Sequence, residues 1–262
     1  MVKILVATPV LDGLLTAEYT GSILGLVEAF AKRRPHVHFE HRYLASSLVT
    51  RARNAYATYI LEDKSFSHLL FIDADMGFGV KAIEKLIDFD GDIVGYFYPK
   101  RGLNYERHHS IARQVEDPVK ARNIAHDYVA TDQLAYKITE KDGVTKRELI
   151  RKRGFLRTAR LGTGLMLIRR KVFESVADRF PELHGPAGEL GYKSMGVKGR
   201  VFQCFEPVQL SNGLYLSEDL AFCHRWVEGC KGEIWGCADE TITHVGRTAF
   251  HGRFIDRYEA KL

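Results

Sequence analysis

Two carboxylates stand one residue apart at the end of an apolar run. Asp73 and Asp75 follow residues 68–72, which read His-Leu-Leu-Phe-Ile. Such a run is typical of a buried central strand, and open α/β sheets bind ligands at the carboxyl ends of their strands. Side chains at i and i+2 of an extended segment point the same way, and paired acidic oxygens suit a hard divalent cation that carries phosphates. The pair therefore predicts phosphate-linked chemistry, although Asp also starts turns and Gly77 follows.

A second acidic pair, Glu218 and Asp219, follows Ser217 where a helix is expected to begin. Ser217 suits an N-cap, and carboxylates in a first turn complement the helix dipole. A structural role therefore explains the pair by itself, and proton acceptance from a substrate is the functional alternative. His244 poses the same choice, because a lone histidine is either a structural residue or a metal ligand.

The net charge of +5 is concentrated in one part of the chain. Residues 100–160 hold 15 Lys and Arg against 8 Asp and Glu. No helix-turn-helix, zinc-finger or RNA-stacking motif accompanies them, so we expect no nucleic-acid partner. The segment fits either a solvated basic face or a surface for an anionic substrate.

The cysteines and the apolar runs indicate the cellular compartment of the protein. The four cysteines lack the pairs two to four residues apart that structural zinc sites use, so we expect free and mostly buried thiols. No run approaches the roughly 20 apolar residues of a membrane span. Residues 1–6 carry one cation and a short apolar stretch, which predicts a first strand and not a signal peptide. We therefore expect a cytoplasmic protein without a transmembrane segment.

The elements that must position these residues alternate between strands and helices. The pattern predicts strands at 2–7, 37–43, 68–72, 92–97, 161–168 and 234–237, and helices at 17–32, 48–61, 80–87, 170–178 and 217–229. This alternation favours an α/β fold with a mostly parallel sheet and helices on both faces. The chain is long enough for one large core, so we expect a single domain over residues 1–262. Residues 100–160 lose periodicity and predict an irregular insertion with a hairpin at Asp142-Gly143.

The order of the motifs resembles that of the GT-A glycosyltransferases. The resemblance consists of Asp73-Ala74-Asp75 after a strand, Gly162-Thr163-Gly164 before a strand, Ser217-Glu218-Asp219 at a helix start, and a late His244. Residues 47–54 also resemble the Arg-Asn segment that many family-two-like members place near the nucleotide. The resemblance spans about residues 2–246, but residues 101–160 match nothing in the family pattern.

This resemblance implies a GT-A, Rossmann-like domain with a donor-binding half (1–99) and an acceptor-side half (161–262). It implies that Asp73 and Asp75 hold the donor's ribose and a Mn²⁺ or Mg²⁺ ion, with His244 as a further metal ligand. Asp219 or Glu218 would face the acceptor and serve as general base. The other residues expected at the nucleotide-sugar are Thr8, Pro9, Arg51, Arg53, Asn54, Ala74, Gly162 and Gly164.

The expected activity is metal-dependent transfer of a sugar from a nucleoside-diphosphate sugar, with UDP favoured, to a hydroxyl acceptor. That acceptor is a glycan, a lipid-linked group or a protein, and the basic segment would act as a lid over it. A haloacid-dehalogenase-like phosphatase is one alternative, but its Asp-x-Asp normally follows the first strand. A sugar nucleotidyltransferase is another, but it expects a glycine-rich loop where residues 7–13 stand. A nucleic-acid or glycan-binding module would explain the basic segment but not the acids.

Overall fold

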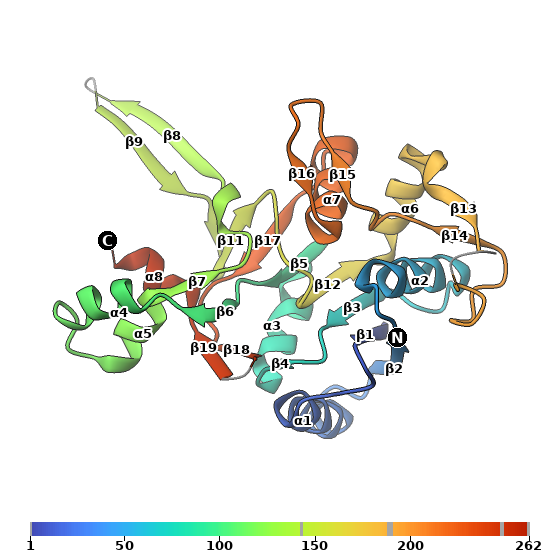
Figure 1. Cartoon of the computed structure of the whole chain (residues 1–262), viewed down its shortest axis with the longest axis horizontal. Coiled ribbons are helices and arrows are strands. Elements are labelled where there is room, and N and C mark those ends of the chain that lie inside the picture. The colour runs from blue at the N-terminus through green and yellow to red at the C-terminus, as the bar shows by residue number, and fades with distance from the viewer. Residues whose placement is uncertain (1, 142–143, 188–190, 247–248, 261–262) are drawn as a thin grey trace.

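The computed structural model describes residues 2–141, 144–187, 191–246 and 249–260. Its centre is an eight-stranded sheet in the order β10-β11-β17-β5-β12-β3-β1-β2 (Figure 1). The strands are β1 (Val2–Val10), β2 (Val37–Ala45), β3 (His68–Ile72), β5 (Ile93–Tyr96), β10 (Arg151–Lys152), β11 (Phe155–Thr158), β12 (Leu165–Arg169) and β17 (Ile234–Cys237). The fold is therefore a mixed α/β domain.

Strand direction departs in part from the expected mostly parallel sheet. β1 is parallel to β2 and β3, and β17 is parallel to β5. β12 lies antiparallel between β3 and β5, and β11 is antiparallel to β17. The sheet is therefore mixed, because β11 and β12 both run against the strands beside them, and apolar periodicity in a sequence does not encode strand direction.

Helices cover both faces of the sheet, as expected. α1 (Ala17–Arg33) and α3 (Val80–Phe89) pack on the face that carries Ile4 and Val6. α2 (Val49–Glu62), α6 (Arg170–Arg179) and α7 (Glu218–His224) pack on the opposite face, which carries Leu5 and Phe71 (Figure 1). Successive strand residues alternate between the faces, so the central strands are apolar throughout because both faces are buried.

The segment at residues 100–160 is not irregular. It contains β6 (Pro99–Leu103), α4 (Tyr105–Ala112), α5 (Pro118–Ala125), β7 (His126–Tyr128), the short helix η1 (Thr131–Gln133), β8 (Tyr136–Lys141) and β9 (Val144–Leu149) before β10 and β11 join the main sheet. The expected hairpin is present as β8 and β9, although Asp142 and Gly143 lie outside the described residues. The helices escaped prediction because each is only eight residues long, too short for apolar residues to repeat with a clear helical period.

The remaining elements are small. β4 (Met76–Gly77), β18 (Ile242–Val245) and β19 (Ala249–Gly252) form a three-stranded sheet in the order β19-β18-β4. The others are η2 (Pro181–Leu183), β13 (His184–Pro186), β14 (Arg200–Phe202), β15 (Val208–Gln209), β16 (Tyr215–Leu216), the π-helix η3 (Arg225–Gly229) and α8 (Phe254–Glu259). Within the described chain, every helix is too short or too polar to cross a bilayer.

Candidate functional site

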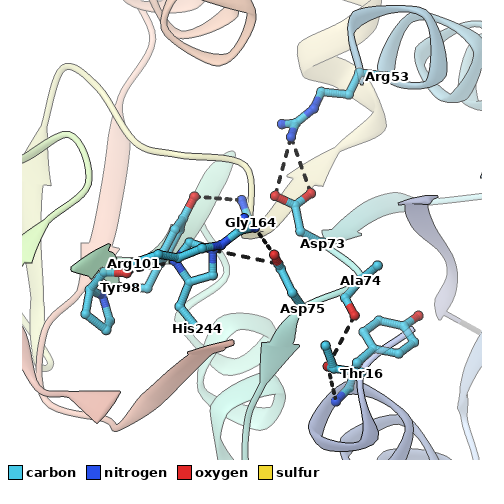
Figure 2. A network of polar contacts seen from close by, with 11 residues as sticks. Thr16, Arg53, Asp73, Ala74, Asp75, Tyr98, Arg101, Gly164 and His244 are labelled. Carbon is cyan, nitrogen blue, oxygen red and sulfur yellow. Dashed lines mark hydrogen bonds and ion pairs between the residues drawn. The ribbon is translucent and has the colours of Figure 1, made fainter. Parts of the chain in front are cut away.

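The candidate site lies where β3 ends and the chain turns. β3 stops at Ile72, and Met76 N donates to the Asp73 carbonyl at 3.0 Å. Because residues 73–75 form a turn and not an extended segment, the carboxylates of Asp73 and Asp75 diverge (Figure 2). This corrects the expectation that they point the same way. The two acids serve separate clusters, which are described in turn.

Asp73 faces a buried arginine on α2. The Nη2 atom of Arg53 lies 3.3 Å from Asp73 Oδ1, and its Nε lies 3.8 Å from Glu218 Oε1. The Arg53 side chain is only 5% exposed. Burial opposes its charge, but Asp73, Glu218 and Asp219 together raise the pKa of Arg53. Among the described residues its Nη1 has no hydrogen-bond partner, so this fixed cation retains a donor that suits an anionic ligand.

Asp75 belongs to the second cluster, with His244 and Arg101. β18 pairs with β4 so that His244 lies opposite Met76, and His244 Nε2 comes within 3.7 Å of Asp75 Oδ1. The Pro99 carbonyl lies 2.8 Å from His244 Nδ1. Since a carbonyl only accepts, Nδ1 carries the proton and Nε2 keeps its lone pair, which accepts from Arg101 Nε at 2.9 Å. Burial lowers the pKa of His244, which favours this neutral form.

A cation fits the second cluster in part. No three His, Cys, Asp or Glu side chains converge on a metal position among the described residues. Asp75 and His244 supply two suitable donor atoms, and Asp75 Oδ1 is buried without a hydrogen bond to any described group. Mg²⁺ is commonly held by one or two carboxylates, with substrate phosphates and water as further ligands. The pair therefore suits a cation that arrives with a phosphate, whereas Asp73 faces Arg53 instead (Figure 2).

The glycine loop packs against Tyr98, a residue that sequence reasoning missed. The Tyr98 hydroxyl accepts from Gly164 N at 3.1 Å, and Asp73 N donates to the Gly164 carbonyl at 2.9 Å. A Cβ at Gly162 would collide with the Tyr98 hydroxyl, and one at Gly164 would lie 2.7 Å from its ring Cζ. Burial and the nearby Asp73 carboxylate raise the pKa of Tyr98. Its position directly after the strand expected at residues 92–97 was the available signal.

Two residues expected at the donor lie in the interior. The Thr8 side chain is fully buried and bonds the Tyr19 hydroxyl at 2.6 Å. Asn54 is also fully buried and donates to Glu206 Oε1 at 2.8 Å. Both side chains thus tie elements of the core together, and contact between these two residues and a nucleotide stays a prediction. Arg51 is partly buried and lies two residues before Arg53, a spacing that directs it to a different side of α2.

Glu218 and Asp219 have different surroundings at the start of α7. Glu218 faces Arg53, and burial raises its pKa despite the guanidinium. Asp219 Oδ1 accepts from Ser217 Oγ at 2.6 Å and from Leu220 N at 2.8 Å. Asp219 therefore caps a helix amide through one oxygen, and Oδ2 remains for another partner.

A cleft of about 580 Å³ opens beside the two acids. Its lining combines Asp73, Ala74, Asp75 and Arg101 with an apolar wall. That wall consists of Pro9, Val10, Leu11, Leu14, Leu15 and Val49. The cleft thus joins carboxylates and a guanidinium to an apolar surface, a combination typical of sites for small polar molecules with a flat apolar part.

Comparisons with solved structures give distant likenesses. No family model and no curated protein matches the chain. Among solved structures it is similar to A197 from STIV, with a TM-score of 0.43 and 14% identity over 94% of this chain and 86% of that one. It is also similar to mannose-1-phosphate geranyltransferase from Thermus thermophilus, with a TM-score of 0.36 and 10% identity over 90% of this chain and 74% of that one. The class that the fold and site define is a mixed α/β domain with a charged cleft at one sheet edge.

Proposed function

We propose that this chain is a glycosyltransferase that takes a sugar from a nucleoside-diphosphate sugar, with UDP favoured, to a hydroxyl acceptor. The observation that carries the proposal is convergence. Asp73, Asp75, Arg53, Glu218 and His244 come from four separate parts of the sequence and gather at one edge of the sheet. The cleft beside them has room and an apolar wall for a nucleoside.

The donor's diphosphate would lie at the Asp75 cluster. Asp75 and His244 would hold a Mn²⁺ or Mg²⁺ ion, which when bound neutralises charge on the departing diphosphate. Arg53, which is buried, holds Asp73 in place and keeps a donor, Nη1, that has no hydrogen-bond partner among the described residues. Asp73 then suits hydrogen bonds from donor hydroxyls, since an ionised carboxylate only accepts.

Transfer requires a group that removes the acceptor's proton. The acceptor oxygen bonds to the anomeric carbon, the bond from that carbon to the diphosphate oxygen breaks, and its electrons leave with the diphosphate. The acceptor's proton goes to a carboxylate of the acidic pair. Asp219 Oδ2 fits this role because Oδ1 is held by two hydrogen bonds. Glu218 is the second candidate, because burial raises its pKa and so makes its carboxylate a stronger base.

One alternative loses support at Asp73. A phosphatase that uses the first Asp as nucleophile needs a free carboxylate oxygen. In Asp73, however, Oδ1 lies 3.3 Å and Oδ2 lies 3.5 Å from Arg53 Nη2. A guanidinium on both oxygens lowers nucleophilicity, because it stabilises the negative charge.

The experiment measures thermal stability with a panel of nucleoside diphosphates and their sugars, with and without Mn²⁺. Ligand at a hundred times its Kd stabilises the native state by about 2.7 kcal/mol, so the melting temperature should rise by roughly 5–10 °C. The rise should need Mn²⁺ and be lost in Asp75→Ala, while the exposed control Asp178→Ala should respond like the unchanged protein. No rise with any nucleotide, or release of free phosphate from phosphomonoesters, would contradict the proposal.

A further inference from the structure

Arg101 occupies the space between the two candidate cation ligands. It starts from β6, reaches across to the turn after β3, pairs with Asp75 Oδ2, and donates from Nε to His244 Nε2 at 2.9 Å (Figure 2). One guanidinium therefore engages both residues that would bind a cation, His244 through Nε2 and Asp75 through Oδ2, while Asp75 Oδ1 has no hydrogen-bond partner among the described groups. Arg101 belongs to none of the sequence motifs described above.

We propose that Arg101 is a displaceable internal cation: it fills the cation position of the free protein, yields it to a divalent ion, and then binds the donor's diphosphate. This inference rests on the proposed function for its diphosphate step only. The first step concerns the protein and the ion alone.

A divalent ion and the Arg101 guanidinium cannot both bind His244 Nε2. A neutral imidazole has one lone pair on its unprotonated nitrogen, and in His244 that lone pair accepts from Arg101. It cannot bind an ion at the same time. The Pro99 carbonyl fixes the proton on Nδ1, so the ring has no second free nitrogen to offer. An ion that uses His244 must therefore displace the guanidinium.

Arg101 is able to move, unlike the other arginine of the site. Its side chain is 52% exposed, whereas that of Arg53 is 5% exposed. Its stem runs past Gly246, where a Cβ would come within 3.2 Å of Arg101 Cδ. The absence of a side chain at Gly246 thus leaves room for the stem where it lies. One arginine is fixed in the interior, and the other lies at the cleft, which it helps to line.

Once displaced, the guanidinium stays beside the cleft. It is a planar fork of N–H donors that matches the oxygens of a phosphate, and the diphosphate of the proposed donor would lie within its reach on the ion. Arg101 then contributes positive charge where the leaving group gains negative charge.

The test measures Mn²⁺ binding by electron paramagnetic resonance without nucleotide, then UDP binding by calorimetry at saturating Mn²⁺. Arg101→Met should bind Mn²⁺ about tenfold more tightly, because a charge-assisted hydrogen bond no longer competes. The same variant should bind UDP about tenfold more weakly, because a phosphate contact is lost. Lys100→Met removes the same charge from the neighbouring exposed residue and should change neither affinity by more than about twofold.

The outcomes separate the two proposals. Unchanged Mn²⁺ affinity in Arg101→Met, or an equal gain in Lys100→Met, would overturn the displacement. A Mn²⁺ gain that persists in Arg101→Met/His244→Ala would also overturn it, because the shared atom would be irrelevant. A gain in Mn²⁺ affinity with unchanged UDP affinity would overturn the diphosphate role. If the unchanged protein binds no nucleotide, the proposed function fails while the Mn²⁺ comparison still decides the displacement.

Discussion

At the scale of single residues, two arginines organise the site, because each pairs with a different aspartate of the Asp73–Asp75 pair. Arg53 pairs with Asp73 and Arg101 pairs with Asp75, although the two aspartates form a single Asp-x-Asp motif in the sequence. Two carboxylates close together repel unless cations lie between or beside them. The turn at residues 73–75 directs the acids apart, so each carboxylate meets its own guanidinium. The chemistry of the motif therefore depends on residues from α2 and β6.

Asp219 gives the sharpest prediction at this scale. If it only caps α7, Asp219→Asn should cost about 0.3–1 kcal/mol of stability and leave transfer almost unchanged. If it is the base, the same near-isosteric change should slow turnover by about 10²–10⁴-fold. We expect the second result with an unchanged dissociation constant for the donor, because Asp219 is proposed to face the acceptor.

Glu218→Gln is the matched variant for that measurement. It removes one of the two carboxylates that pair with the buried Arg53 guanidinium, so that only Asp73 pairs with it. The free energy of unfolding should therefore fall more than in Asp219→Asn. A large loss of turnover in Glu218→Gln alone would move the base by one residue. Full activity in both variants would leave the pair as a helix start.

At the scale of elements, the sequence predicted which segments form helices and strands better than how they are directed. The helix expected at residues 17–32 is Ala17–Arg33, and the strand expected at 234–237 is Ile234–Cys237. Apolar periodicity reports burial, and burial does not encode direction. The antiparallel β12 was therefore beyond reach, as was the pairing of β18 with β4 that brings His244 to Asp75.

The glycine loop shows how an element is shaped by its neighbour. Gly162 and Gly164 are expected from the sequence to lie at the nucleotide-sugar, and in the structure the side chain that fills the space beside them is Tyr98. Tyr98 lies 66 residues from Gly164 in the chain and bonds its amide. No local pattern contains that contact, so a structural reason for both glycines is visible only in the folded chain.

Substitution of this loop should therefore be rescued at Tyr98. Gly164→Ala should destabilise by about 1–3 kcal/mol through overpacking, because its Cβ would lie 2.7 Å from the Tyr98 ring. In a Tyr98→Leu background the same change should cost less, which urea unfolding of the four-protein cycle would measure as coupling. Gly25→Ala is the control, because a Cβ there meets nothing within 4 Å. Equal costs of Gly164→Ala in both backgrounds would refute packing against Tyr98.

At the scale of the whole molecule, the basic segment divides into parts with different positions. β6 carries Arg101 to the site, α4 and α5 pack beside α8, and β10 and β11 complete the sheet. The hairpin of β8 and β9 projects away from the body (Figure 1). The other parts of the segment are packed against the body, so the hairpin is the part of the segment that could act as a lid.

Shortening the hairpin tests its role. Replacement of residues 138–147 by Asn-Gly keeps the Lys137–Glu148 pair and joins it with a two-residue turn. The side chains removed are solvent-exposed where they are described, Ile138 by 61%, so little buried area is lost. We expect a melting temperature within about 3 °C of the unchanged protein, and an unchanged dissociation constant for the donor. Leu149→Ala is the control: it truncates a residue of the main core that is only 6% exposed, and a loss of about 2–4 kcal/mol should lower the melting temperature by roughly 5–10 °C. A tenfold weaker donor in the shortened protein would instead show that the hairpin folds back over the cleft when ligand binds, and would restore the lid.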